Sequence, residues 1–257
     1  MKKTTLGIAL ALACVQASAF DLSQAIQMGK DALNKPATAT TQTATPAKSG
    51  VDALTPTEMN GGLKEALTKG AEAAVAQLGK QDGFFGDKNL RIPLPDNLKK
   101  ADKLMRAIGM GKQADQLVLS MNRAAEAAVP EAKVLLVNAV KDMTLEDAKG
   151  ILTGGDQAAT SFFRKKTEAP LGEKFLPIVK TATDQVGLAQ TYNKYAGTAA
   201  KFGLVKQDQA TIENYVSQQA LDRLYKVIGE QERAIRTNPI GYGSDLLKKV
   251  FGAVMGK

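Results

Sequence analysis

Polar side chains interrupt an otherwise apolar stretch at residues 117–129, where Asn122, Arg123 and Glu126 occur close together. On a helix, Glu126 follows Asn122 by four residues and Arg123 by three, so the three side chains can contact one another. Because buried charges are usually paired, one interpretation is an internal ion pair or a cap for another helix end. The alternative interpretation is a site that binds the polar head of an otherwise apolar ligand.

A second group of this kind is Phe162-Phe163-Arg164, where two aromatic side chains precede a guanidinium that suits a carboxylate. A further arginine, Arg236, lies near the end of the longest continuous helical pattern. The sequence therefore predicts a ligand-binding set and predicts neither catalytic residues nor metal ligands. The set is Asn122, Arg123, Glu126, Phe163, Arg164 and Arg236.

The composition removes most of the common catalytic groups, since the chain has no His, no Trp and one Cys. Without imidazole there is no Ser-His-Asp or Cys-His pair and no histidine-dependent zinc site. Carboxylates remain, and Glu65, Glu126, Glu213 and Glu232 all fall in predicted helices. Their spacing singles out no acid–base pair, and a glycosidase would lack the Trp on which sugars commonly stack. No cofactor is predicted.

The first nineteen residues have the order of a secretory signal: Lys2 and Lys3, an apolar run at 6–13 and a small triplet at 17–19. Cleavage after Ala19 predicts a periplasmic or secreted protein without cysteine, because Cys14 lies in the removed segment. The alternative is lipidation of Cys14, which would tether the protein to a membrane.

The charge of the chain is mildly basic, with 34 Lys and Arg against 26 Asp and Glu and a formal charge of +8. Basic and acidic residues are interleaved along the predicted helices, so no nucleic-acid partner is predicted. Weak attraction to anionic lipid fits this charge. No stretch is long and apolar enough for a membrane-spanning helix, so the predicted membrane contact is peripheral.

Residues 20–57 differ in composition from the rest of the chain. Residues 21–33 have the apolar spacing of a short amphipathic helix, whereas 34–57 are rich in Thr, Ala and Pro. The second stretch has almost no large apolar side chains and cannot build a core. The sequence therefore predicts a flexible linker at 34–57 and a folded domain at 58–257.

Apolar residues repeat at helical spacing through nearly all of the predicted domain. The predicted helices cover 62–78, 96–108, 112–129, 130–143, 144–152, 157–167, 170–186, 188–202, 209–236 and 244–255. Asp96 is expected to cap one helix, and Thr144 to Asp147 form a capping signature at the start of another. Pro130 is expected in the first turn of its helix, and Pro170 is expected to begin a further one. The closing helix at 244–255 either covers the core or lies on a membrane surface. The fold class is therefore all-α, a single multi-helix bundle-like domain of roughly nine to twelve helices.

Several short segments occur in a fixed order along the domain. They are GGLKEAL at 61–67, DGF at 82–84, RIPLP at 91–95, MNRAAE at 121–126, MTLEDAKGIL at 143–152, AATSFFR at 158–164 and IRTNP at 235–239. Together they resemble the bacterial family called domain of unknown function 4197. The resemblance covers residues 58–257 and implies an exported, all-helical envelope protein, and it assigns no catalytic residue.

These observations support three predicted functions. The first is a non-enzymatic periplasmic or envelope protein that binds an apolar ligand, such as a fatty acid or lipid, between its helices, where bundles commonly place ligands. The alternative is an envelope module that contacts a protein or the cell wall. The third is a carboxylate-dependent hydrolase.

Overall fold

All six candidate ligand-binding residues lie on helices. The computed structural model describes residues 55–109, 111–203 and 210–239, with 245, 249–250 and 252, all within one unit, Ala47–Lys257. The helices are α2 (Pro56–Leu78), α3 (Asp96–Ala107), α4 (Gly111–Ala128), the 3-10 helix η2 (Val129–Glu131), α5 (Ala132–Lys141), α6 (Leu145–Thr153), α7 (Ala158–Thr183), α8 (Gly187–Lys201) and α9 (Ile212–Thr237). No strand occurs in these residues, which confirms the all-α class; the predicted number of helices stays a prediction. The predicted signal peptide with Cys14, the short helix and most of the linker lie outside the described residues.

A capping box begins α2. The hydroxyl of Thr55 accepts a hydrogen bond from the backbone N–H of Glu58, and the carboxylate of Glu58 accepts one from the backbone N–H of Thr55. Glu58 also pairs with Lys249 near the end of the chain. The hydrogen bonds from Lys249 and Thr55 lower the pKa of Glu58 to about 2. With this capping box, α2 begins at Pro56, slightly ahead of the predicted domain start at 58.

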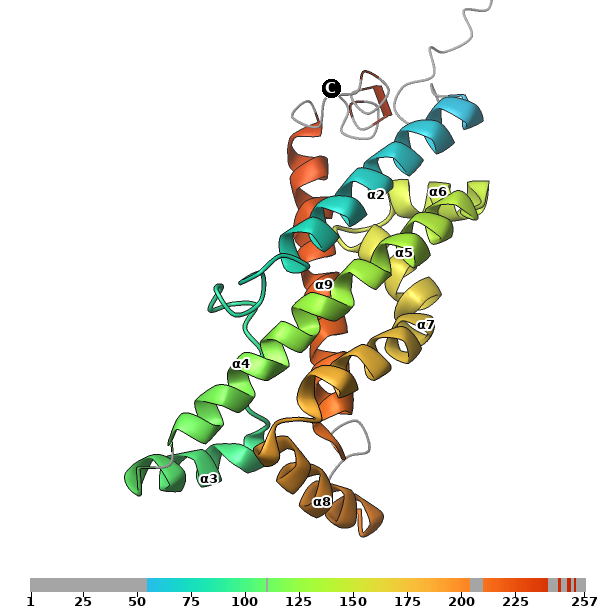
Figure 1. The fold of residues 1–257 in the computed structure, drawn as a ribbon. Coiled ribbons are helices and arrows are strands. Elements are labelled where there is room, and N and C mark those ends of the chain that lie inside the picture. Colours follow the sequence, from blue (N-terminus) through green and yellow to red (C-terminus); the bar gives the residue numbers. More distant parts are fainter. Residues whose placement is uncertain are drawn as a thin grey trace, which may run out of the picture. The chain divides into compact units, whose positions relative to one another are not determined.

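The helix α9 is the central element, because it packs against α2, α4, α7 and α8 (Figure 1). Its sequence repeats apolar residues every three or four positions, and the structure buries that face, including Val216, Leu224 and Ile235. A Cβ on Gly70 of α2 would meet Ile235 at 3.4 Å. The small residue therefore lets α2 lie close to the end of α9.

The helix α7 corrects the expectation that Pro170 begins a new helix. It runs without interruption from Ala158 to Thr183, with Pro170 and Pro177 inside it. Each internal proline removes one backbone hydrogen bond. The apolar spacing continues through both of them, and the buried side chains Phe163, Leu171, Phe175 and Val179 lie four or eight residues apart. Burial of this face against α4 and α9 outweighs the lost hydrogen bonds.

The start of α3 differs from the expectation that Asp96 caps it. Pro95 occupies the N-cap position without a side-chain hydrogen bond, and Asp96 lies in the first turn, where it pairs with Lys99 at 2.6 Å. An acidic residue in the first turn still interacts favourably with the helix dipole. The chain reaches this point through the extended segment 91–95, whose Ile92 is fully buried.

The helices α4 and α5 follow each other along nearly one line, joined by η2 (Figure 1). Pro130 lies within η2, in the first-turn position that the sequence predicted. The next helix, α6, is capped as expected: Thr144 and Asp147 form a second capping box. The hydrogen bond from the backbone of Thr144 is the largest cause of the lowered pKa of Asp147.

The helices α3 and α8 lie at the same end of the described unit, and both pack against α4 (Figure 1). At the C-terminal end of the chain, residues 245, 249–250 and 252 are helical, and Val250 is fully buried. The rest of the predicted closing helix at 244–255 lies outside the described residues. None of the helices that the structure describes combines the length and apolarity needed to cross a membrane.

Candidate functional site

Asn122 lies on α4 and holds the extended segment 91–95. Its side-chain oxygen accepts a hydrogen bond from the backbone N–H of Ile92 at 2.8 Å. Its amide nitrogen donates to the carbonyl oxygens of Ile92 at 2.9 Å and Val118 at 2.7 Å. Asn122 is fully buried, and both of its amide hydrogens are used within the protein.

Glu126 and Arg123 hold the turn before that segment. One oxygen of Glu126 accepts hydrogen bonds from the backbone N–H groups of Phe84 and Phe85, both at 3.1 Å. The other oxygen accepts from Arg123 at 2.6 Å, and Arg123 also pairs with Asp82 at 2.8 Å. Asp82 has a positive φ of 65°, which costs a non-glycine residue energy and has to be supported by its surroundings. In the structure this cluster is thus an ion pair that also caps a turn.

Arg236 and Glu232 cap the start of α7. One oxygen of Glu232 accepts from the backbone N–H of Ala159 at 3.0 Å, and the other from the N–H and hydroxyl of Thr160 at 2.9 and 2.8 Å. Arg236 donates to the same carboxylate at 3.1 and 2.8 Å and to the carbonyl of Ile151 at 2.9 Å. A carboxylate is stabilised at a helix N-terminus by the unpaired N–H groups there. Arg236 is therefore the counter-ion of a cap.

Phe163 and Arg164 are neighbours in sequence but lie in different environments. Phe163 is buried, and its ring packs edge to face against Phe162 with centroids 5.8 Å apart. Arg164 lies between α7 and α9, where its guanidinium is 2.7 Å from Glu168 and 3.1 Å from Asp222. The candidate residues are thus distributed over three places: the turn held by α4, the cap of α7, and the surface between α7 and α9.

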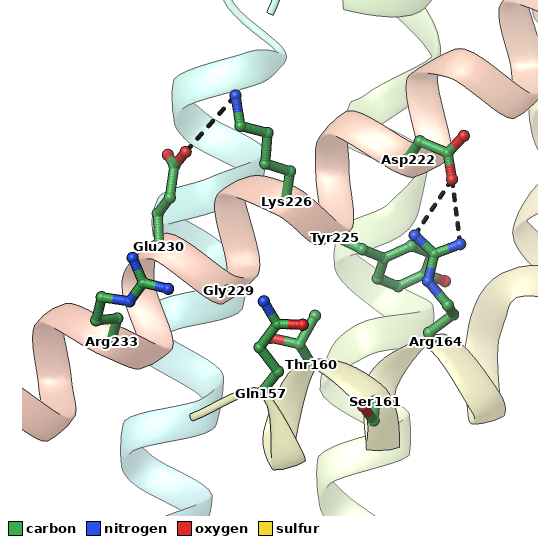
Figure 2. Close-up of a pocket in the computed structure, with 10 residues that line it drawn as sticks. All are labelled: Gln157, Thr160, Ser161, Arg164, Asp222, Tyr225, Lys226, Gly229, Glu230 and Arg233. Carbon is green, nitrogen blue, oxygen red and sulfur yellow. Dashed lines mark hydrogen bonds and ion pairs between the residues drawn. The ribbon is translucent and has the colours of Figure 1, made fainter. Parts of the chain in front are cut away.

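A cleft, which we call the first cleft, opens beside Arg164 between the start of α7 and the second half of α9 (Figure 2). It has a volume of about 390 Å³. Its lining residues are Gln157, Thr160, Ser161, Arg164, Asp222, Tyr225, Lys226, Gly229, Glu230 and Arg233. Three of these are cations and two are carboxylates, so the lining has a formal charge of +1.

Contacts within the first cleft leave one of its cations available. Arg164 is bonded to Asp222 and lies 4.6 Å above the ring centre of Tyr225, a cation–π contact. Lys226 is 3.9 Å from Glu230. Within the described part of the chain, the guanidinium of Arg233 has no ion-pair partner, and Figure 2 draws it without a dashed line.

Tyr225 presents a neutral ring to Arg164. Burial raises the pKa of Tyr225 to about 12, although a hydrogen bond with Thr167 at 2.8 Å acts in the opposite direction. The phenol therefore stays protonated at neutral pH, and Arg164 contacts an uncharged π face. Burial raises the pKa of Tyr215, on the same helix, to about 12 as well.

The α9 side of the first cleft was missed by the sequence analysis. Asp222, Tyr225, Gly229 and Arg233 recur every three or four residues along the helix, with Lys226 next to Tyr225. The signal was present, but a polar stripe of this kind is typical of any solvated helix face. Only the packing of α7 beside it makes the stripe one wall of a cleft.

A second cleft, of about 400 Å³, lies further along the same two helices. It adjoins the first, because Glu168 on its edge is the ion-pair partner of Arg164. Leu176 and Leu221 supply apolar surface in it, beside polar side chains that include Glu168 and Glu173. A Cβ added to Gly172 would find its nearest neighbour only at 4.0 Å. The two clefts together form one polar and one apolar compartment along α7 and α9.

The space between α2, α6 and α9 is much smaller. It has a volume of about 20 Å³ and is bounded mainly by apolar side chains such as Leu63, Leu67 and Ile151. That is room for about one water molecule. This part of the core is closely packed, whereas the two clefts lie at the surface between α7 and α9.

The remaining candidate carboxylates are also engaged. Glu213 accepts hydrogen bonds from the side-chain amide of Asn193 at 2.9 Å, and Glu65 pairs with Lys69 at 2.8 Å. Like the two capping glutamates described above, they lie apart and have separate partners. Among the residues that the structure describes, no three His, Cys, Asp or Glu side chains form a group suited to a metal ion.

Comparison with known proteins places the chain in a family. The family model described as "Protein of unknown function (DUF4197)" matches residues 53–252, which is most of the chain. No curated protein and no solved structure matches the chain.

Proposed function

The chain belongs to the DUF4197 family, whose function is unknown, and we propose that it is a non-enzymatic binding protein of the cell envelope. Its ligand is an anionic amphiphile of the fatty-acid type, which lies in the two clefts between α7 and α9. The observation that carries the proposal is the adjacency of a cation-rich cleft and an apolar cleft along one pair of helices.

The first cleft suits the anionic head of such a ligand. Arg233 has no ion-pair partner in the described residues, and Lys226 makes long contacts, 3.9 Å to the carboxylate of Glu230 and 3.4 Å to the backbone carbonyl oxygen of Asn89. Both cations can therefore turn toward a carboxylate at little cost, and charge-assisted hydrogen bonds of this kind are the strong ones. Arg164 is fixed by its two carboxylate partners and by Tyr225, so it forms a rigid wall.

The second cleft suits the apolar part of the ligand. Leu176 is exposed there although it is large and apolar, and covering it removes apolar surface from water. Each cleft has a volume within the range of small-molecule sites, roughly 300–1,000 Å³. The hydroxyl of Ser217, which is buried and has no partner among the described residues, adds a polar group beside this cleft.

The envelope location is a separate part of the proposal and rests on the predicted signal peptide at 1–19. Cell fractionation followed by mass spectrometry of the N-terminus tests it. We expect a periplasmic chain that begins at Phe20. A chain that retains Met1 in the cytoplasm would refute this location.

Dodecanoate titration tests the binding site. We expect saturable binding by calorimetry and a raised Tm, because a ligand that binds only the folded state stabilises it. Arg233→Gln and Lys226→Gln should each weaken binding about fivefold. The matched control is Lys133→Gln, because Lys133 is also an exposed lysine paired with a glutamate, at 3.1 Å, and lies on α5 away from both clefts.

A substitution in the second cleft separates the head from the tail. Gly172→Leu fills that cleft without a close contact, since the nearest atom to an added Cβ is at 4.0 Å. It should weaken dodecanoate binding at least tenfold and leave the Tm of the free protein unchanged or raised. Absence of dodecanoate binding, or equal weakening by the Lys133 control, would refute the proposed function.

A further inference from the structure

Large apolar side chains are exposed at the end of the molecule formed by α3 and α8. Among the described residues, the four most exposed large apolar side chains are Phe202 at 76%, Leu104 at 67%, and Ile108 and Val134 at 64%. Leu104 lies on α3, Ile108 directly follows α3, and Phe202 directly follows α8. Three of the four therefore lie on, or directly after, the two helices that Figure 1 shows at one end. Large apolar side chains exposed together at one end of a molecule are typical of an interaction surface.

The exposed residues on α3 share one face of that helix. Ile108 follows Leu104 by four residues, which places the two side chains next to each other. The packing of α3 against α4 covers neither of them. Among the described residues, this face is therefore an exposed apolar edge formed by two neighbouring side chains.

The same end of the molecule is basic. Residues 96–116 contain five Lys and Arg against three Asp, and residues 187–203 contain two Lys and no acidic residue. Each of the three aspartates has a cationic partner, because Asp96 pairs with Lys99, while Asp102 and Asp115 share Arg106. The two segments thus have a formal charge of +4, half of the +8 of the whole chain.

We propose that the α3–α8 end docks on an anionic lipid surface, with Leu104, Ile108 and Phe202 inserted at the membrane interface and the lysines placed among the headgroups. Exposed apolar residues combined with a basic surround are what interfacial binding requires, since insertion and headgroup attraction add together. A second copy of the chain is a poorer occupant, because a symmetric contact would bring two positively charged faces together. This docking surface is separate from the two clefts and does not depend on them.

Vesicle co-sedimentation of the chain from Phe20 onward tests the proposal. Vesicles of phosphatidylcholine alone are compared with vesicles that also contain phosphatidylglycerol. We expect binding only to the anionic vesicles, with an affinity that falls as salt is added. Equal binding to both kinds of vesicle, or binding to neither, would overturn the proposal.

Matched substitutions locate the surface. Leu104→Ser and Phe202→Ser should each lower the partition coefficient about tenfold, because a large apolar side chain leaves the interface. Lys103→Gln and Lys201→Gln should each lower the partition coefficient about fivefold, because each removes the attraction of one lysine to the anionic surface. The control for apolar exposure is Val134→Ser, equally exposed but on α5, and it should change nothing.

Thermal unfolding of every variant checks that the substitutions leave the fold intact, as expected for exposed positions. If one of them fails to fold, the lipid and salt dependence of the unchanged protein still decides the proposal. A loss of binding in Val134→Ser as large as that in Leu104→Ser would remove the assignment to the α3–α8 end. If the unchanged protein does not bind vesicles but forms dimers, and Phe202→Ser abolishes those dimers, the surface would instead be assigned to contact with a second copy of the chain.

Discussion

The cap of α7 allows a quantitative prediction. Replacing Glu232 with Gln preserves the shape of the side chain but replaces one acceptor oxygen with an NH₂ group. Glu232 receives hydrogen bonds from two backbone N–H groups, one hydroxyl and the guanidinium of Arg236. An amide has one oxygen, so at least one backbone N–H is left facing another donor. The variant should therefore destabilise the protein.

The size of the effect follows from burial. An unsatisfied buried N–H costs about 1–3 kcal/mol, and Arg236, whose side chain is only 17% exposed, loses its counter-ion at a cost of about 1–2 kcal/mol. We expect Glu232→Gln to lower the free energy of unfolding by about 3 kcal/mol. For a domain of this size, that corresponds to a fall in Tm of about 6–12 °C.

Urea denaturation followed by the helical circular dichroism signal measures this effect. The control is Glu230→Gln on the same helix, because the side chain of Glu230 is 52% exposed and its ion pair with Lys226 is long, at 3.9 Å. This control should change the free energy of unfolding by no more than about 0.5 kcal/mol. If Glu232→Gln costs less than about 1 kcal/mol, the carboxylate does not stabilise the helix start, and the reasoning is wrong.

Four further predictions concern particular residues. Asn122→Ala should lower the free energy of unfolding by about 2–3 kcal/mol in the same urea assay, because the buried backbone groups that the amide bonds lose their partner. Gly150→Ala should raise it by about 0.5–1 kcal/mol, since no atom lies within 4 Å of the added Cβ. Gly154→Ala should lower it by about 1–3 kcal/mol, because its Cβ would lie 2.6 Å from a backbone oxygen. Burial raises the pKa values of Tyr215 and Tyr225 in the folded chain to about 12, so the unfolded chain loses these protons first. The stability of the fold should therefore fall as the pH rises from about 10 to about 12. Phenolate absorbance of the folded chain measures the two pKa values, and ionisation of both phenols near pH 10 would contradict this prediction.

Local patterns predicted the helices well where one physical rule decides the outcome. The capping residues of α6 and the apolar repeat of α9 depend on residues close together in the sequence, so the sequence alone was sufficient to predict these two helices. The rule that proline begins a helix failed at Pro170. There the unfavourable effect of proline inside a helix competes with burial of α7 against two other helices. Tertiary packing prevailed there, and a single sequence does not show which face has a partner.

The candidate site was predicted only in part, for a similar reason. The sequence singled out Arg164 beside two aromatic residues, but its partners are Tyr225 and Asp222, the latter 58 positions further along the chain. The arginine was identifiable by its surroundings in a helix, whereas the partners depend on how α7 and α9 align. Likewise, nothing in the sequence indicated that Asn122 would bond a proline-flanked segment 30 positions earlier.

The central position of α9 determines when the protein can fold during its synthesis. The helices α2, α4 and α7 bury apolar faces against α9, yet α9 is made after all of them. Until residue 237 has been made, the parts of these faces that α9 covers stay exposed, although α4 and α7 can already pack against each other, and contacts so distant in sequence form slowly. A nascent chain that stops before residue 212 should therefore remain sensitive to proteases. For the envelope location proposed above, late completion of the core would delay folding, and an incompletely folded polypeptide is the state that a narrow export channel admits.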